Sequence, residues 1–177
     1  QLRQARSMFF AMTERLDEHV GRILDRIDAL GLRDRTVVVF TSETGWTLGE
    51  HRLFAAAPAV YDEMIRCPLR IRAPGLLEIA RLEPPVTMQG RSLLTLLRNP
   101  RTDRWTDECF IQFDRIDTFA CQARGLVVRN YKYLRYFAGH DALYDLKLDP
   151  DELHNAAQAP EYRAVVSVLR NRLNHWQ

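Results

Sequence analysis

The sequence predicts an α/β protein in which part of a sheet with flanking helices is followed by a small antiparallel sheet and a C-terminal helix. Three observations predict this fold class. Apolar residues recur at helical spacing over the first 30 residues, a β-branched run follows at residues 36–39, and four short strand-like segments come after Pro100. We therefore divide the chain into residues 1–100, the α/β part, and residues 101–177, the second sheet and last helix.

The first helix is predicted from apolar residues that recur every three or four positions, which gives a helix one apolar stripe. Gly31 follows the stripe and is a favourable helix stop. The stripe consists of Phe9, Met12, Leu16, Val20, Ile23, Ile27 and Leu30.

Residues 36–41 (TVVVFT) predict a strand buried on both faces, which is typical of a parallel sheet covered by helices. Residues 59–65 predict a short helix, and residues 69–72 predict a second strand that ends in a turn at residues 73–75. A further short helix is predicted at residues 92–97.

The segments after Pro100 predict short strands at 108–113, 125–129, 132–137 and 142–146, separated by turn residues. Asn130 and Tyr131 would join the middle pair as a hairpin, so these segments predict a small antiparallel sheet. Pro160 stands at a favourable first-turn position for the last helix. One face of that helix would carry Tyr162, Val165, Val166, Leu169, Leu173 and Trp176.

The composition of the chain excludes several classes of protein function. The 177 residues make one domain or a large piece of one, and a hydrophobic share of 46% is enough to bury a core. A net charge of +2 with interspersed signs is too small to predict a nucleic-acid or membrane surface, and no apolar run is long enough to span a bilayer. Three widely spaced cysteines without a C-x-x-C pair argue against a disulfide framework or a zinc site.

The chemistry is expected in residues 40–51, which read FTSETGWTLGEH. In α/β proteins, ligand groups sit just beyond the carboxyl ends of the strands, and this polar turn leaves the predicted strand 36–41. The candidate site residues in it are Glu43, Thr44 and His51.

Five segments, in the same order, resemble motifs of the sulfatases, members of the alkaline-phosphatase-like superfamily. Residues 40–51 resemble the second metal-binding motif of that family, close to F-T-S-D-H-G-x-x-L-G-E-H. The other four are VGRILD at 20–25, YDEMIRCPL at 61–69, MQGRSLL at 88–94, and LYDL at 143–146 with DPDE at 149–152 and Asn155. The resemblance implies a partial alkaline-phosphatase-like sheet in the first part of the chain and hydrolysis of sulfuric esters.

The resemblance also implies roles for the candidate residues. Sulfatases hold a divalent cation, usually Ca²⁺, which supplies charge stabilisation to the transferring group. Glu43 stands at the family's metal-binding aspartate and offers the same oxygen ligand one methylene longer. Thr44 stands at the family's His/Asn position and offers a hydroxyl. His51 is a candidate proton donor or polar contact. The alternatives are a solvated turn in which Ser42 and Thr44 bond nearby backbone, and a histidine that only shapes the loop.

Several departures from the family pattern bear on activity. The chain has no C/S-x-P-x-R motif, the source of the family's formylglycine nucleophile, and lacks the family's early acidic pair. Residues 55–58 read AAAP where the family commonly carries G-K-G-P, so the lysine that contacts sulfate is missing. Residues 76–85 are shorter than the matching family segment. We therefore expect a C-terminal sulfatase portion that is inactive as this chain.

Two alternatives remain. The first is a non-catalytic pseudoenzyme or interaction module, which the substituted functional positions favour. The second, within the superfamily, is a phosphonate or phosphodiester hydrolase. If the chain is active, the expected partner is a small-molecule or glycan ester of sulfate or phosphate, with neither nucleic acid nor membrane. We also expect self-association, because a partial sheet leaves an open edge and an uncovered apolar face.

Overall fold

The computed structural model describes residues 1–55, 59–72, 93, 96, 99, 105, 107–115, 121–137 and 139–176. Its contacts divide the chain into two units. The first comprises Gln1–Thr44, Leu48–Glu50 and Cys67–Arg104, and the second comprises Gly45–Thr47, His51–Arg66 and Trp105–Gln177. The boundary predicted between residues 100 and 101 and the turn at 73–75 lie outside the described residues, as do residues 92, 94, 95 and 97 of the helix predicted at 92–97.

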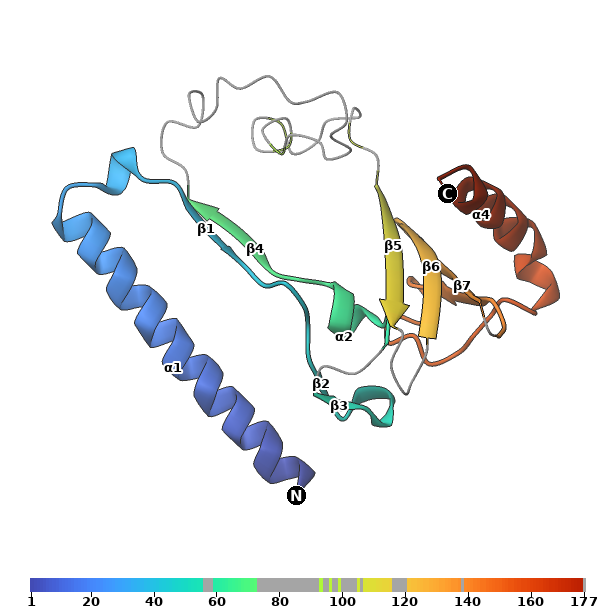
Figure 1. Ribbon diagram of the computed structural model, residues 1–177, viewed down its shortest axis with the longest axis horizontal. Helices are drawn as coiled ribbons and strands as arrows, with labels where there is room; N and C mark the ends of the chain where they lie inside the picture. The colour runs from blue at the N-terminus through green and yellow to red at the C-terminus, as the bar shows by residue number, and fades with distance from the viewer. Residues whose placement is uncertain are drawn as a thin grey trace. The chain divides into compact units, whose positions relative to one another are not determined.

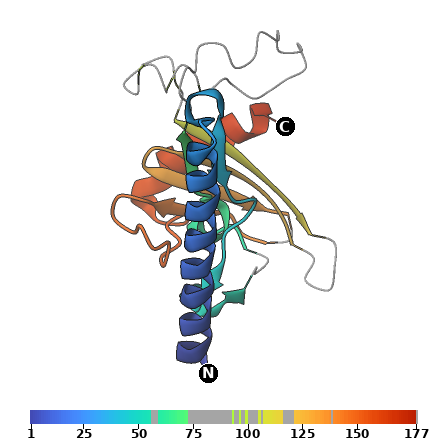
Figure 2. The same cartoon turned by 90° about the vertical axis from the view of Figure 1, so that its left-hand side faces the viewer.

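The first unit begins with a long helix, α1, at Leu2–Ala29. Figures 1 and 2 show it as one unbroken rod. Gly31 ends it with a left-handed φ of 65°, and its N–H donates to the carbonyl of Asp28 at 3.0 Å. Glycine adopts that conformation without the steric cost of a Cβ, which confirms the predicted stop.

The strand β1, Val38–Thr41, pairs with β4, Leu69–Arg72, in an antiparallel two-stranded sheet. Both strands were predicted, but burial of β1 on two faces in a parallel sheet was wrong. Three of its four residues are exposed. Figure 1 shows α1 running alongside this pair of strands, and a cavity of about 540 Å³ lies between them. Its apolar lining comes from Leu16, Val20 and Leu24 of α1 and from Val38, Phe40 and Ile71 of the strands.

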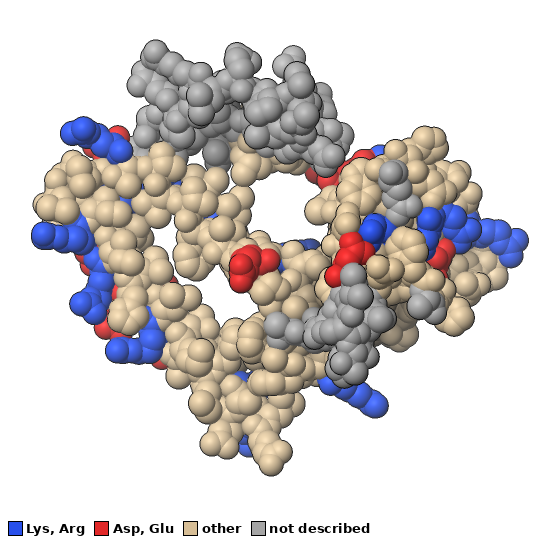
Figure 3. All heavy atoms as spheres, in the orientation of Figure 1, with Lys and Arg blue, Asp and Glu red and all other residues tan. Residues whose placement is uncertain are grey.

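Ion pairs tie the end of α1 to β4. Asp28 accepts from Arg72 at 3.0 Å and from Arg33, which follows the helix in a 3₁₀ turn at Arg33–Arg35, at 3.1 Å. Arg33 is 65% exposed, so its pair with Asp28 contributes at most about 1 kcal/mol. The pair between Arg72 and Asp28 is partly buried. Charged side chains also lie along α1, as Figure 3 shows. None of the described helices combines the length and apolar character that crossing a bilayer requires.

The second unit is built on a four-stranded antiparallel sheet in the order β5–β6–β7–β8. The strands are Glu108–Arg115, Cys121–Val128, Tyr131–Tyr136 and Ala142–Asp145. The predicted small sheet is therefore confirmed, including the hairpin between its middle strands. Two short strands, β2 at Thr47–Leu48 and β3 at Phe54–Ala55, pair separately.

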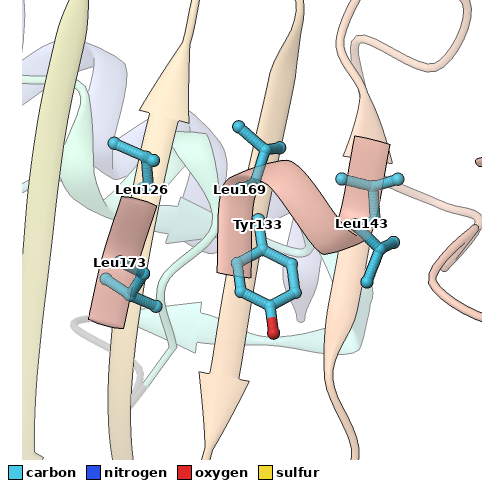
Figure 4. Packing of buried hydrophobic residues seen from close by; sticks show 6 residues of the cluster. Leu126, Tyr133, Leu143, Leu169 and Leu173 are labelled. Carbon is cyan, nitrogen blue, oxygen red and sulfur yellow. The ribbon is translucent and has the colours of Figure 1, made fainter. Parts of the chain in front are cut away.

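One face of the sheet is covered by the last helix, α4, at Arg163–Trp176, which follows a 3₁₀ turn at Pro160–Tyr162. Successive strands pair Leu126 with Tyr133 and Tyr133 with Leu143, so the three side chains share this face. Figure 4 shows them facing Leu169 and Leu173 of the helix. The buried cluster is Leu126, Tyr133, Leu143, Val166, Leu169 and Leu173, which confirms the predicted apolar face of the helix.

The opposite face of the sheet packs against the segment around the one-turn helix α2, Asp62–Ile65. The buried residues of this second cluster are Val60, Ile111, Leu134, Ala142 and Tyr144. The sheet of the second unit is thus covered on both faces, by α4 on one and by residues 60–65 on the other.

The buried tyrosines predict a loss of stability at high pH. Burial and a hydrogen bond to Asp141 raise the pKa of Tyr133, and burial raises the pKa of Tyr144. The unfolded chain releases these phenol protons at about pH 10, whereas the folded chain retains them. The free energy of unfolding should therefore be constant at neutral pH and fall above about pH 10, by up to about 1.4 kcal/mol per pH unit for each phenol.

Urea unfolding at a series of pH values from neutral to strongly alkaline checks this prediction. Tyr144→Phe should make the alkaline loss shallower, because one raised phenol is removed. An unchanged slope in that variant would contradict the assignment of the loss to the buried phenols.

Candidate functional site

Glu43 and Thr44 lie just after β1, in the first unit, and both are exposed. The Ser42 hydroxyl donates to the Thr44 carbonyl at 2.6 Å, the local backbone bond expected of a Ser/Thr turn. Calcium takes roughly six to eight oxygen ligands, and within the described residues no three His, Cys, Asp or Glu side chains gather as a metal site would need. The side chains described around Glu43 therefore do not by themselves make a calcium site.

His51 belongs to the second unit and is held in a tight turn. It has a left-handed backbone, with φ 51°, and Arg52 follows with φ 61°, a region that non-glycine residues seldom occupy. Its ring stacks on Tyr61, with centroids 3.6 Å apart and planes 3° from parallel. Nε2 lies 3.6 Å from Oε2 of Glu63, and only 9% of the side chain is exposed.

The helix α2, which carries Glu63 and follows Tyr61, also contacts the middle of the polar segment 40–51. The Gly45 N–H donates to the Met64 carbonyl at 2.8 Å, and the Trp46 N–H donates to the Glu63 carbonyl at 3.0 Å. A Cβ added to Gly45 would lie 1.7 Å from that Glu63 oxygen. Only glycine allows this approach, so position 45 sets how closely the loop contacts α2.

Gly45→Ala should therefore destabilise the second unit by at least about 1–3 kcal/mol, the usual cost of inserting a methyl into a filled space. The clash is with backbone, which cannot move aside as a flexible side chain would. Gly139→Ala is the matched control in the same unit, because no described residue lies within 4 Å of its added Cβ. Chemical denaturation of both variants checks this. Equal stabilities would show that the backbone of α2 can shift to accommodate the methyl group at little cost.

A buried ion pair stands beside α2. Lys132 of β7 is fully buried, and its Nζ lies 2.5 Å and 2.7 Å from the two carboxylate oxygens of Glu152. Glu152 Oε2 also accepts the Asp62 N–H at 3.0 Å, and Lys132 Nζ lies 3.4 Å from Asp62 Oδ1. Burial raises the pKa of the Glu152 carboxyl, against the opposing effect of Lys132.

Sequence reasoning did not connect Tyr61, Glu63 or the Lys132–Glu152 pair with His51. Two signals were present. Lys132 is one of only two lysines among 25 basic residues. The segments 61–69 and 149–152 also resemble family motifs, yet the contact between Asp62 and Glu152 that joins them cannot be read from the sequence.

The structure thus groups the predicted residues differently from the sequence. Glu43 and Thr44 are neighbours in the first unit, whereas His51 is grouped with Tyr61 and Glu63 in the second. What the second group offers chemically is an imidazole with one nitrogen facing a carboxylate and one face covered by a phenol ring. Such an imidazole can donate or accept a proton in a fixed orientation.

Comparison with known proteins adds a family match. The family model described as N-sulphoglucosamine sulphohydrolase, C-terminal, matches residues 72–177. The N-acetylglucosamine-6-O-sulfatase of Bacteroides thetaiotaomicron is 29% identical over 195 residues, which cover 96% of this chain and 35% of that protein. The chain spans 34% to 41% of the length of the curated relatives it matches.

Solved structures show the same likeness. The structure of BT4656 in complex with its substrate D-glucosamine-2-N,6-O-disulfate has a TM-score of 0.83 at 27% identity, covering 91% of this chain and 38% of that one. The phosphonate monoester hydrolase of Agrobacterium radiobacter has a TM-score of 0.86 at 25% identity, covering 96% and 40%.

Proposed function

This chain belongs to the sulfatase family whose C-terminal region the matching model describes, and from that premise we propose that it supplies the C-terminal part of a sulfuric ester hydrolase. The observation that supports this most is the family match across more than half of the chain. The likeness to sulfatases of alkaline-phosphatase-like fold supports it independently.

The proposed substrates are sulfate esters of small molecules or glycans. A matched relative is a sulfatase of N-acetylglucosamine, and a similar structure holds a disulfated glucosamine. We assign His51 as a polar contact or proton donor to the ester, because its imidazole is held in one orientation. We assign Glu43 and Thr44 as contributors to a Ca²⁺ site that needs further ligands beyond the described residues.

These 177 residues alone should show negligible turnover, because the family's nucleophile motif is not among them. The test is to incubate the purified chain with an aryl sulfate, with and without Ca²⁺, and to follow release of the phenol. We expect release at the rate of buffer alone. Calcium-dependent turnover that Glu43→Gln abolishes would contradict the proposed inactivity.

A chimera tests the hydrolase assignment directly. The matching C-terminal part of the N-acetylglucosamine-6-O-sulfatase would be replaced by this chain, so that the relative supplies the remainder of the protein. We expect the chimera to hydrolyse the ester, and we expect its rate to increase when Glu43→Asp and Thr44→Asn restore the residues of the family motif. A folded chimera without turnover in either form would favour the pseudoenzyme or interaction module, which the substitutions at Glu43, Thr44 and residues 55–58 already favour.

The phosphonate or phosphodiester alternative rests on the likeness to the Agrobacterium enzyme. The same chimera assayed in parallel with an aryl sulfate, a phosphonate monoester and a phosphodiester separates the two assignments. The ratio of the kcat/KM values reports which ester the chimera that carries this chain favours. The predicted self-association is checked by sedimentation of the purified chain.

A further inference from the structure

We propose that Tyr61 and Glu63 are positioning residues for His51, and that the buried carboxylate of Glu152 anchors them by binding the backbone of Asp62. The proposal rests on the proposed function only for what His51 does to an ester. How His51 is held is a statement about the second unit, and it can be measured without substrate.

The contact with Tyr61 fixes the plane of the imidazole. The two rings are 3.6 Å apart and 3° from parallel, so a rotation of the imidazole about its χ2 would break the stack. His51 and Arg52 both have left-handed backbones, a strained arrangement that persists only where the surroundings impose it. The other four histidines, by contrast, are exposed: His19, His140, His154 and His175.

Glu63 determines which imidazole nitrogen of His51 carries the proton. Its Oε2 is buried, has no hydrogen-bond partner among the described residues, and lies 3.6 Å from His51 Nε2. A carboxylate next to one imidazole nitrogen selects the tautomer in which that nitrogen carries the proton. Nδ1 is then the nitrogen left for other contacts.

The anchor is needed because α2 is a single turn of four residues, too short to be stable by itself. Its first backbone N–H, from Asp62, would be without an intrahelical acceptor. Glu152 accepts that N–H at 3.0 Å and is only 2% exposed. Lys132 neutralises Glu152 from the sheet at 2.7 Å and also lies near Asp62, so the four-stranded sheet carries α2 and, with it, the residues that contact His51.

The stack is tested by the NMR signals of His51 in the full chain labelled with ¹³C and ¹⁵N at histidine, with His51→Gln for assignment. A ring stacked on a phenol is shielded, so the carbon-bound imidazole protons of His51 should lie upfield of those of the four exposed histidines. Tyr61→Phe should keep this shift and Tyr61→Leu should abolish it. An unshifted wild-type signal, or equal signals in the two variants, would overturn the role of Tyr61.

The role of Glu63 is tested by the two imidazole ¹⁵N shifts of His51 at alkaline pH, where histidine is neutral. A single tautomer gives widely separated shifts, whereas exchange between tautomers averages them. We expect the wide separation in the wild type and in Glu63→Gln, which keeps an acceptor oxygen, and a reduced separation in Glu63→Leu. Equal separations in all three would overturn this part of the proposal.

The anchor is tested by two double variants that both remove the buried charges. Lys132→Met with Glu152→Gln keeps an acceptor for the Asp62 N–H, and Lys132→Met with Glu152→Met does not. We expect the upfield His51 signal to be retained in the first and lost in the second. Equal signals in both would refute the anchor. Should the second variant not fold while the first does, the Asp62 N–H bond is needed for α2 to form, which supports the anchor.

The NMR results and the activity results can be told apart. Shifts as expected with an inactive chimera would refute the hydrolase assignment and leave the positioning of His51 intact. An active chimera whose turnover is unaffected by Tyr61→Leu would refute the role of the positioned His51 in the reaction and leave the hydrolase assignment intact.

Discussion

Lys132→Met is expected to lower the free energy of unfolding by about 3–5 kcal/mol, the usual cost of leaving a buried charge without its partner. The Lys132 side chain is fully buried, and that of Glu152 is 1% exposed. After the substitution, the Glu152 carboxylate would keep the Asp62 N–H as donor but lose the ammonium that lies within 2.7 Å. The carboxyl must then bind a proton in the folded chain or remain an uncompensated charge.

The matched control is Lys147→Met, since Lys147 is the second lysine of the chain and is exposed. Surface substitutions of this kind usually change stability by less than about 0.5 kcal/mol. Combining Lys132→Met with Glu152→Gln should recover most of the loss, because no buried charge remains. Urea unfolding of the three variants measures this. If the double variant is no more stable than Lys132→Met, the loss arises from packing around the lysine stem and not from charge.

Leu173→Ala is expected to cost about 2–5 kcal/mol, because it removes buried methyl groups and leaves a cavity. Leu173 is fully buried and belongs to the cluster of Leu126, Tyr133 and Leu143 that joins α4 to the sheet. The α4 residues that face away from the sheet are exposed, so no described residue packs on that side of the helix to fill the cavity.

Val168→Ala on the same helix is the control. Val168 is 55% exposed, so its truncation should change the free energy of unfolding by less than about 0.5 kcal/mol. Denaturant unfolding followed by far-UV circular dichroism checks both variants. Equal costs at the two positions would show that α4 is not packed on the sheet as described.

The helices and the second sheet were predictable because their signals are local. The apolar stripes of α1 and α4 have the period of a helix, and Gly31 and Pro160 mark an end and a start. The four strands of the second unit alternate and are separated by turn residues. The burial of β1 was wrong for a physical reason: its run of valines shows only that the strand tolerates burial, whereas its neighbours in space decide whether it is buried.

The site was predictable only in part. The polar loop was found by its place after a strand and by its resemblance to a family motif. The contacts of His51 were not predictable, because the stacking on Tyr61 and the position of Glu63 depend on how α2 packs against the loop in space. The anchor joins residues 90 positions apart, Asp62 and Glu152, and no sequence period encodes such a contact.

The burial of Lys132 has a practical consequence for work with this protein. Of its two lysines, only Lys147 presents its amine to solvent, so acylating dyes and biotin esters react with a single lysine side chain, besides the α-amino group, while the sheet is intact. Any lysine label found in strand β7 therefore marks molecules whose second unit had opened.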